Sequence, residues 1–547
     1  MEASSRSPGA QTSLEPRWLA ARDFESKGDI AAATAAYQDI LRVDPTQAFA
    51  WQRLSGLALA QGRYRQARSA ALEGAAIAVA SRRWKALPYL TRQLLQFDER
   101  EAVCRTIEAA DWSDREILSQ SATLAQQLWL ADANDLALAL TNHALKLIPR
   151  SHLLHYVRAN VLMHQGKSEQ ASAAFEASIQ LQPTFADAHW ALAYHSKAEP
   201  QGSRVDRVKA ALARAPEGSM QSVFLGYALF KELDDADETH AAWDALSAAA
   251  GVMRNNVKYD KEKERLVMQA LRDVFVEPAA STLTLRQRTP IFIVGMPRTG
   301  TTVLDRILGN HSNVASAGEL NVFSVCLGLA LDRPFAVPVG VDAVNAAAKL
   351  NLDAVGSDYL KRTAAQYGQM THLIDKNPLN FLNAGFIARA LPEARILCLL
   401  RNPMDACFSN LKALFPGGGY GYSYDLDDLA AHYRNFHQLA LHWQAVLPQQ
   451  FRIVEYERLI GDTEDQAREL MDFCGLPYEP DCVDIIRNQT PVSTASSSQV
   501  RQPIHARGIE AWRRYERQLA PLRERFSESM PQQAGCSTAS RDTGEPA

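Results

Sequence analysis

The sequence predicts two regions of different architecture, an all-α array of helical repeats followed by an α/β domain with a central parallel sheet. Apolar residues recur at spacings of three and four over residues 16–270, and a step of 34 residues relates segments within that region. After residue 289, four short apolar runs alternate with helical patterns. At 547 residues the chain is long enough for at least two independent cores.

The helical region has an internal period of 34 residues. Small residues and prolines recur at that step, in the pairs Gly28 and Gly62, Ala33 and Ala67, and Pro149 and Pro183. Each unit is expected to pair two helices, with alanine where the helices approach closely and proline where the second helix ends. Residues 80–115 and 216–270 are too degenerate to phase, and an irregular helical bundle remains the alternative.

By its period and its small-residue and proline positions, this region resembles the tetratricopeptide repeat. The resemblance implies a superhelix of tetratricopeptide type over residues 16–270, whose concave face binds a protein, a peptide or a substrate. Residues 271–289 are expected to form a linker, because they contain prolines and small polar residues. Residues 1–15 and 528–547 are poor in large apolar groups and are expected to be disordered.

The composition limits which partners the protein can bind and in which cellular compartment it is expected. The formal net charge of −4 argues against generic attraction to nucleic acid. The first residues contain no apolar stretch of signal-peptide length, and nowhere do about 18 apolar residues run uninterrupted. The seven cysteines are odd in number and lack metal-ligand spacing, so we expect reduced thiols and no metal site. These features predict a cytoplasmic protein without a membrane span, and they leave its oligomeric state open.

The second region contains four expected strands, each followed directly by a polar or glycine-rich element. The strands are Ile291 to Val294, His372 to Ile374, Arg395 to Leu400, and Phe451 to Val454. Strands that alternate with helices form a parallel sheet. In sheets of this class ligands bind beyond the carboxyl ends of the strands, so we expect the functional residues there.

The first expected strand runs into a phosphate-binding loop, in the segment IFIVGMPRTGTT. Glycines let the backbone curl so that N–H groups face inward, and the helix that follows presents its positive dipole end to an anion. The two glycines have the spacing of ATP-binding loops, but Thr301 stands where those loops carry lysine. The cation lies inside the loop instead, at Arg298. A chance glycine turn before a helix is the alternative.

The loop sequence PRTGTT resembles the 5′-phosphosulfate loop of sulfotransferases, and its Pro-Arg form is most similar to tyrosylprotein sulfotransferases and their bacterial relatives with tetratricopeptide repeats. A second motif, LLRNPMDACFSNL, places Arg401 at a strand end and Ser409 eight residues later. In the family these two residues hold the 3′-phosphate of the cofactor; taken alone, Arg401 is equally consistent with a surface cation. The resemblance implies a P-loop-like sulfotransferase domain over residues 290–527.

The resemblance also implies catalytic roles. Glu319 lies 21 residues after Arg298 and would accept the proton of an acceptor hydroxyl, while Lys376 would bridge the leaving group and the sulfonate. Ser496 would stabilise the transition state, although a shift by one position among neighbouring serines stays open. The implied cofactor-binding residues are Arg298, Thr299, Gly300, Thr301, Thr302, Arg401, Ser409, Tyr456, Ser497 and Gln499. A solvated loop carboxylate is the alternative for Glu319, and a core aromatic the alternative for Tyr456.

Three departures from the family pattern matter. Cysteines that pair across the site in animal members correspond to Ser316 and Ile374 here. Where those enzymes carry arginines that bind acidic peptide, just past the catalytic glutamate, this chain has Asn321 and Val325, which weakens the case for acidic tyrosine substrates. A further family arginine is Ala413, with Lys412 the only cation nearby.

The function that follows is transfer of a sulfuryl group from 3′-phosphoadenylyl sulfate (PAPS), without a metal, to a hydroxyl acceptor. The acceptor is a protein tyrosine, a glycan or a small molecule. Two other functions stay open, a protein-interaction scaffold with an inactive nucleotide-binding domain, and a P-loop-type kinase. Because the phosphate-binding loop lacks the lysine of ATP-binding loops, the sequence disfavours the kinase.

Two further segments allow alternative interpretations. Residues 416–425 contain four glycines and three tyrosines and form either a mobile lid over the acceptor or a flexible exposed connection. Residues 509–521 have the pattern of a final amphipathic helix, whose Arg513 and Arg514 face either the nucleotide or the solvent.

Overall fold

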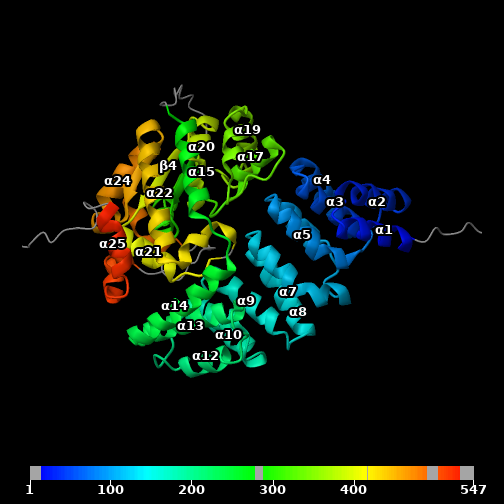
Figure 1. The fold of residues 1–547 in the computed structure, drawn as a ribbon, viewed down its shortest axis with the longest axis horizontal. Helices are drawn as coiled ribbons and strands as arrows, with labels where there is room; N and C mark the ends of the chain where they lie inside the picture. Colours follow the sequence, from blue (N-terminus) through cyan, green and yellow to red (C-terminus); the bar gives the residue numbers. More distant parts are fainter. Residues whose placement is uncertain (1–13, 277–287, 416, 489–502, 530–547) are drawn as a thin grey trace, which may run out of the picture. The chain divides into compact units, whose positions relative to one another are not determined.

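The structure is a computed structural model that describes residues 14–276, 288–415, 417–488 and 503–529 (Figure 1). The chain divides into two compact units. The first comprises residues 1–149 with 328–334, and the second comprises residues 150–327 with 335–547. The fold class expected from the sequence is confirmed, since a long all-α region precedes an α/β region built on a parallel sheet.

Helices are the only regular secondary structure in the described part of the first 276 residues. In the first unit they are α1 (Glu15–Ser26), α2 (Ile30–Val43), α3 (Ala48–Ala60), α4 (Tyr64–Ala80), the 3₁₀ turn η1 (Trp84–Ala86), α5 (Leu87–Gln96), α6 (Arg100–Glu108), α7 (Arg115–Leu130) and α8 (Asn134–Leu147). In the second unit they are α9 (His152–His164), α10 (Ser168–Leu181), α11 (Ala186–His195), α12 (Val205–Leu212), α13 (Met220–Asp235), α14 (Thr239–Asn256) and α15 (Lys261–Val274). Successive helices pack as hairpins, α1 with α2, α3 with α4, α9 with α10 and α13 with α14.

The 34-residue step corresponds to one tight turn per helix pair. A residue with positive φ recurs throughout the array at steps of 34 to 36 residues, at Gly28, Gly62, Asp98, Asp132, Gly166, Gly202 and Asp237. At most of these positions the next helix begins two residues later, as α2 does at Ile30. The alanines expected at the close approach, Ala33 and Ala67, are fully buried. The period therefore continues through the stretches that the sequence could not phase.

The α/β part contains a five-stranded sheet in the order β2-β3-β1-β4-β5, with every neighbouring pair parallel. The strands are β1 (Thr289–Gly295), β2 (Val314–Ser316), β3 (His372–Asp375), β4 (Arg395–Leu400) and β5 (Phe451–Glu455). Four of them are the four apolar runs identified in the sequence. The fifth, β2, is a three-residue edge strand that the sequence analysis missed.

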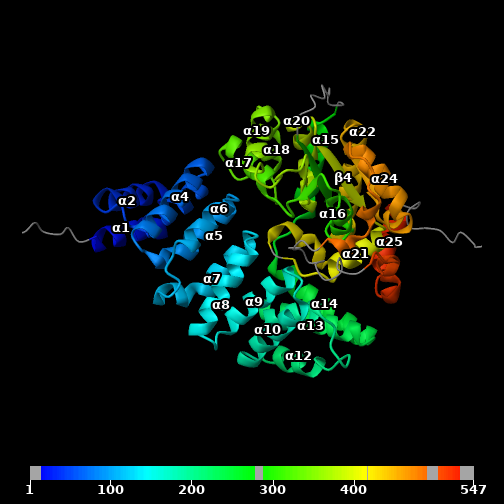
Figure 2. The same ribbon diagram turned by 180° about the vertical axis from the view of Figure 1, so that it is seen from behind.

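Helices surround this sheet in both views (Figures 1 and 2). They are α16 (Thr301–Gly309), α17 (Val322–Leu331), α18 (Val341–Ala347), α19 (Leu352–Arg362), η2 (Pro378–Asn383), α20 (Ala384–Ala390), α21 (Pro403–Leu411), η3 (Gly418–Tyr424), α22 (Leu426–Val446), α23 (Tyr456–Gly461), α24 (Thr463–Cys474), η4 (Pro480–Val483), η5 (Ile485–Arg487), η7 (Ala506–Gly508), η8 (Ala511–Tyr515) and α25 (Ala520–Ser529). The core between β1, α16 and α24 includes Ile291, Leu304 and Met471, none of them exposed. This packing fixes α16, and with it the loop at its start.

One expectation about the C-terminal part is wrong, and one of the two alternatives for residues 416–425 does not hold over residues 418–424. The amphipathic helix expected over residues 509–521 is absent, because this segment forms the 3₁₀ turn η8 and α25 begins at Ala520. The tyrosine-rich stretch is not an exposed connection over residues 418–424, because Tyr422 and Tyr424 are buried. The Tyr422 ring stacks on the His432 ring, with 3.5 Å between the ring centroids. Within the described residues, no helix combines the length and the apolar character that a membrane span requires.

Candidate functional site

The carboxyl ends of all five strands lie at one edge of the sheet, because every pair is parallel. The phosphate-binding loop follows β1, and Lys376 follows β3 directly. Arg401 follows β4, and Tyr456 follows β5. The short β2 leads into the turn that carries Glu319. Parallel topology thus brings to one edge residues that are up to 158 positions apart in the chain.

The loop after β1 adopts backbone conformations that glycine favours. Gly295 has φ 144° and Gly300 has φ 102°, and Arg298 between them has φ 64°. A Cβ atom at Gly300 would lie 2.3 Å from a ring carbon of Tyr456, so a side chain there would displace that ring. Gly300 is also the residue from which α16 starts, and its carbonyl accepts the first helical hydrogen bonds. The loop therefore leads directly into a helix N-terminus, the place where backbone amides bind anions.

Hydrogen bonds from other elements fix the carbonyl groups of this loop. Thr299 Oγ1 donates to the Met296 carbonyl at 2.7 Å, inside the loop itself. Asn410 Nδ2, from α21, donates to the Pro297 carbonyl at 2.8 Å. Arg401 Nη1 donates to the carbonyl of Arg298 at 2.7 Å. With three successive carbonyls anchored, the loop is held in shape before any ligand arrives.

The Arg401 guanidinium joins three segments at this edge. Besides its bond to the loop it donates from Nη1 to Ser409 Oγ at 3.3 Å and from Nη2 to the carbonyl of Gly508. It lies 4.7 Å from the ring centroid of Tyr456. Its Nε atom is buried and has no hydrogen-bond partner among the described residues, which leaves a donor available to an anionic ligand.

A cavity of about 340 Å³ opens between the loop, α21, α23 and residues 503–511. Its lining includes five lysine and arginine side chains, Lys197, Arg298, Arg401, Lys412 and Arg507. No aspartate or glutamate belongs to the lining within the described ranges. Burial, and next the neighbouring Arg401, lower the pKa of Arg298 to about 10, so its guanidinium remains protonated at neutral pH. A concentration of positive charge next to a helix N-terminus fits a ligand with phosphate groups.

Glu319 and Lys376 form an ion pair with 2.6 Å between Oε1 and Nζ. The Lys376 side chain is 1% exposed, whereas that of Glu319 is 42% exposed. The backbone positions the pair, because Lys376 N–H donates to the Gly318 carbonyl at 2.9 Å and Asn377 Nδ2 to the Leu320 carbonyl at 2.8 Å. Glu319 therefore reaches solvent while a buried cation holds it in place, an arrangement that suits a proton acceptor.

The structure brings most of the expected site residues into the cavity and leaves others outside it. Those that line it are Arg298, Gly300, Thr301, Thr302, Arg401, Ser409 and Tyr456. Thr299, within the loop, is fully buried, and Glu319 and Lys376 do not belong to the cavity lining among the described residues. Ser496, Ser497 and Gln499 lie outside the described residues.

The sequence analysis missed several residues of the cavity. Lys197 comes from the segment after α11, and His505 and Arg507 come from the segment before η8. Nothing in the sequence connects Lys197 with the phosphate-binding loop about 100 residues away. Its place in the cavity becomes apparent only in the folded structure. Arg514 was expected to face either the nucleotide or the solvent. Its guanidinium instead pairs with Asp234 and Asp237.

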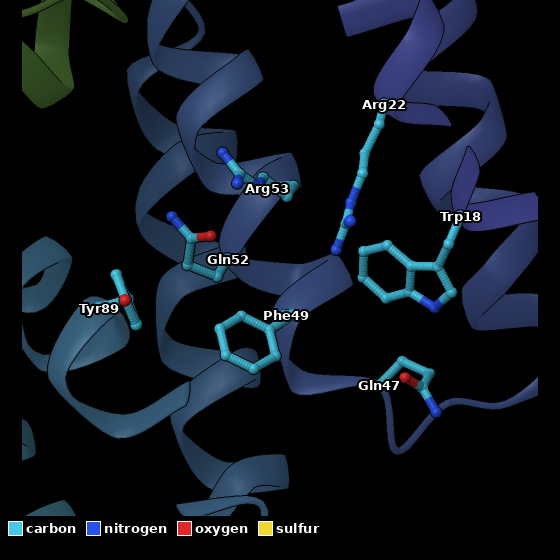
Figure 3. Close-up of a pocket in the computed structure, with 7 residues that line it drawn as sticks. All are labelled: Trp18, Arg22, Gln47, Phe49, Gln52, Arg53 and Tyr89. Carbon is cyan, nitrogen blue, oxygen red and sulfur yellow. The ribbon is translucent and has the colours of Figure 1, made fainter. Parts of the chain in front are cut away.

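A second cavity, of about 440 Å³, lies in the first unit (Figure 3). Three aromatic side chains line it, Trp18 of α1, Phe49 of α3 and Tyr89 of α5, together with Arg22 and Arg53 and with Gln47 and Gln52. Phe49 and Tyr89 are 37% and 55% exposed, large values for aromatic residues whose rings contact each other. In Figure 3 the Arg22 side chain extends between the Trp18 indole and the residues of α3. The cavity thus combines apolar rings with positive charge.

Comparisons with known proteins concern mainly the α/β part. Residues 290–480 match the family described as "Sulfotransferase family". An uncharacterized protein of Aquifex aeolicus (strain VF5) is 33% identical over 316 residues, 55% of this chain and 41% of that protein, so the match spans less than half of the relative. Protein-tyrosine sulfotransferase 2 of Gallus gallus is 21% identical over 232 residues, 41% of this chain and 62% of that protein. The solved "Sulfotransferase Domain from the Synechococcus PCC 7002 Olefin Synthase" is 18% identical with a TM-score of 0.31, covering 43% of this chain and 90% of that one.

Proposed function

Because the C-terminal part of the chain is a sulfotransferase-family domain related to the protein-tyrosine sulfotransferases, preceded by a helical region that resembles tetratricopeptide repeats, we propose that the protein transfers a sulfuryl group from PAPS to a hydroxyl acceptor. The observation that carries the proposal is the basic cavity at the carboxyl edge of the sheet. There a glycine loop, a helix N-terminus, Arg298 and Arg401 converge.

The residues present fit a nucleotide that carries a phosphate at each end. The loop amides and Arg298 would hold the 5′-phosphosulfate end, and Arg401 with Ser409 would hold the 3′-phosphate, for which the unpartnered Nε of Arg401 is a ready donor. When bound, PAPS supplies an activated sulfuryl group whose S–O bond to the 5′-phosphate breaks as a bond to the acceptor oxygen forms.

Side chains of the protein would then accept the proton of the acceptor hydroxyl and stabilise the charge that develops on the leaving group. Glu319 accepts the proton of the attacking hydroxyl, because its carboxylate is accessible and fixed in position. The Lys376 ammonium stabilises the negative charge that develops on the leaving phosphate oxygen. Ser496 lies outside the described residues, and its role remains part of the proposal.

Nucleotide binding tests this proposal against a kinase function. We expect 3′-phosphoadenosine 5′-phosphate to bind the purified protein in calorimetry with a dissociation constant between about 1 μM and 1 mM, the range of typical KM values. ATP with Mg²⁺ should bind at least about tenfold more weakly, because no lysine follows Gly300 to neutralise the β- and γ-phosphates. Tighter binding of ATP with Mg²⁺ would favour the kinase instead.

Transfer of label separates an active enzyme from an inactive scaffold. Incubation of the protein with ³⁵S-labelled PAPS and a cell lysate should yield a labelled acceptor. Nucleotide binding without any labelled product would favour the scaffold. As part of the same proposal we assign the protein to the cytoplasm, where the six cysteines in the described ranges, all free thiols, would stay reduced.

For the first unit we propose that the cavity of Figure 3 binds an acidic peptide segment that also carries an aromatic or aliphatic side chain. Arg22 and Arg53 would attract the carboxylates, and the exposed rings of Phe49 and Tyr89 would cover the apolar side chain. Glu25 pairs with Arg53 at 3.4 Å, so the net charge of the cavity stays positive through Arg22. Partner or acceptor recognition would then take place on the helical array.

A fluorescence-polarisation experiment with labelled synthetic peptides tests this second proposal. A peptide rich in Asp and Tyr should bind, and its counterpart with Lys in place of Asp should not. Tyr89→Ala should weaken binding by about tenfold, as loss of an aromatic anchor does. The control is Leu130→Ala, which removes an equally exposed side chain (55%) from α7. Equal binding of the two peptides would exclude an acidic ligand.

A further inference from the structure

Two lysines of the cavity belong to no motif identified in the sequence as a binding site. Lys412 caps the C-terminus of α21, three residues after Ser409, so both lie on the same side of that helix. Lys197 follows α11, one of the helices that precede the α/β part, and its side chain is 64% exposed. Both lysines line the cavity together with Ser409 and Arg401.

The helices before the α/β part are bonded directly to the end of α21. Tyr194 OH, on α11, donates to the Lys412 carbonyl at 2.7 Å, and Tyr227 OH, on α13, donates to the Leu411 carbonyl at 3.0 Å. Two carbonyls that a helix end would otherwise leave unpaired are thereby satisfied. This contact sets the position of Lys412, and through the same helix that of Ser409.

Both lysines also lie next to the C-terminal turn of α13. The Nζ atom of Lys197 is 3.7 Å from Asp235 Oδ1, and Asp235 also pairs with Lys231 one turn earlier. Lys412 interacts electrostatically with Asp234 of the same turn. Both lysines therefore lie beside the same turn of α13, and Lys412 follows Ser409 by three residues on α21.

The charged form of Lys412 is less favoured than that of an ordinary lysine. Burial, and then Arg298, Arg401 and Lys231, lower the pKa of Lys412 to about 8, against a single opposing effect from Asp234. A bound anion between these cations would reverse this effect. A cavity that gathers like charges without a carboxylate in its described lining is built to hold a multiply charged anion.

We propose that Lys197 and Lys412 bind the 3′-phosphate of the nucleotide, so that the helical region supplies part of the nucleotide site. This inference rests on the proposed function and deepens it. It gives the helices after α10 a direct part in nucleotide binding, in addition to any recognition of partners by the first unit. A sulfotransferase domain cut off from those helices would lack both Lys197 and the tyrosine contacts that position Lys412.

Calorimetry with two nucleotides tests the inference on the full-length chain. Lys197→Ala should weaken binding of 3′-phosphoadenosine 5′-phosphate by about fivefold, a modest loss because the side chain is exposed. Lys412→Met should weaken it by about tenfold or more, since this side chain is half-buried and its charge contacts the ligand. Binding of adenosine 5′-phosphate, which lacks the 3′-phosphate, should change by less than about twofold in either variant. Lys209→Ala on α12, an exposed lysine outside the cavity lining, is the matched control.

The outcomes distinguish failure of the inference from failure of the proposed function. A parent protein that binds neither nucleotide overturns the proposed function, and the inference with it. A parent that binds 3′-phosphoadenosine 5′-phosphate while Lys197→Ala and Lys412→Met bind it equally well overturns the inference alone. Equal losses for both nucleotides also overturn it, because the lysines would then act on the 5′ side.

The pH dependence of binding provides a second readout for Lys412. Its ammonium is charged below pH 8 and loses its proton above, so affinity for 3′-phosphoadenosine 5′-phosphate should fall between pH 7 and pH 9. The phosphate groups of the ligand are already ionised over this range, since their second pKa is about 6. Asp234 and Lys231 of α13, Arg298 of the loop and Arg401 after β4 surround the same ammonium. The Lys412→Met variant identifies the lysine's own contribution, because the fall should be absent there.

Discussion

Replacing Glu319 by glutamine should lower the rate of sulfuryl transfer by about 10² to 10⁴-fold, the range that general-base catalysis usually contributes. Glutamine has nearly the same shape, and its amide oxygen can still accept the hydrogen bond from Lys376. What is lost is the ability to accept a proton. The rate is measured as initial transfer of ³⁵S from saturating labelled PAPS to the acceptor.

Nucleotide affinity distinguishes this role from a structural one. Because Glu319 does not belong to the cavity lining of the described residues, the Glu319→Gln variant should bind 3′-phosphoadenosine 5′-phosphate within about twofold of the parent. Glu455→Gln is the matched control, since Glu455 is an exposed carboxylate at the end of β5 on the same edge of the sheet. An unchanged transfer rate in Glu319→Gln would remove Glu319 from the mechanism, and an equal fall in the control would point to general electrostatics.

The sheet and its edge could be predicted because the strands are buried on both faces. In an α/β pattern, a continuous apolar run such as Ile291 to Val294 indicates a strand of a parallel sheet. The polar elements that follow these runs indicate the edge of the sheet where ligands bind. The strand β2 was missed for the converse reason, because its three residues include the exposed Ser316 and leave no pattern to detect. Even so, Ser316 and Ile374, the two positions where relatives were expected to carry paired cysteines, are register neighbours in β2 and β3.

The helical repeat was only partly visible because its turns do not need glycine. Each turn requires one residue with positive φ, which aspartate tolerates better than most residues. Asp98 and Asp237 hold that conformation in the two stretches that could not be phased, where a search for recurring glycine fails. The contribution of Lys197 to the cavity was invisible for another reason, since a contact between distant elements leaves no local pattern.

Replacing Arg401 by lysine should weaken binding of 3′-phosphoadenosine 5′-phosphate by about 10² or more. Lysine keeps the positive charge but not the planar fork of donors, and the Arg401 fork bonds the Arg298 carbonyl, Ser409 and the Gly508 carbonyl together. Loss of the unpartnered Nε also removes a donor aimed at the ligand. Calorimetry measures the affinity, and adenosine 5′-phosphate should lose much less, because it has no 3′-phosphate for Arg401 to bind.

The same substitution should lower the melting temperature, so a control must separate folding from binding. Arg395 stands at the opposite end of β4, where its guanidinium donates to the Phe473 carbonyl at 2.8 Å and lies 5.7 Å from the Phe473 ring. Arg395→Lys therefore removes a comparable set of structural contacts without touching the cavity, and it should reduce the melting temperature while leaving nucleotide affinity within about twofold. If both variants lose affinity to the same degree, the loss comes from general destabilisation and not from a contact at the cavity. If only Arg401→Lys loses affinity, and equally for both nucleotides, Arg401 acts by holding the loop in shape. If only Arg401→Lys does, and mainly for the ligand with a 3′-phosphate, its guanidinium binds that phosphate.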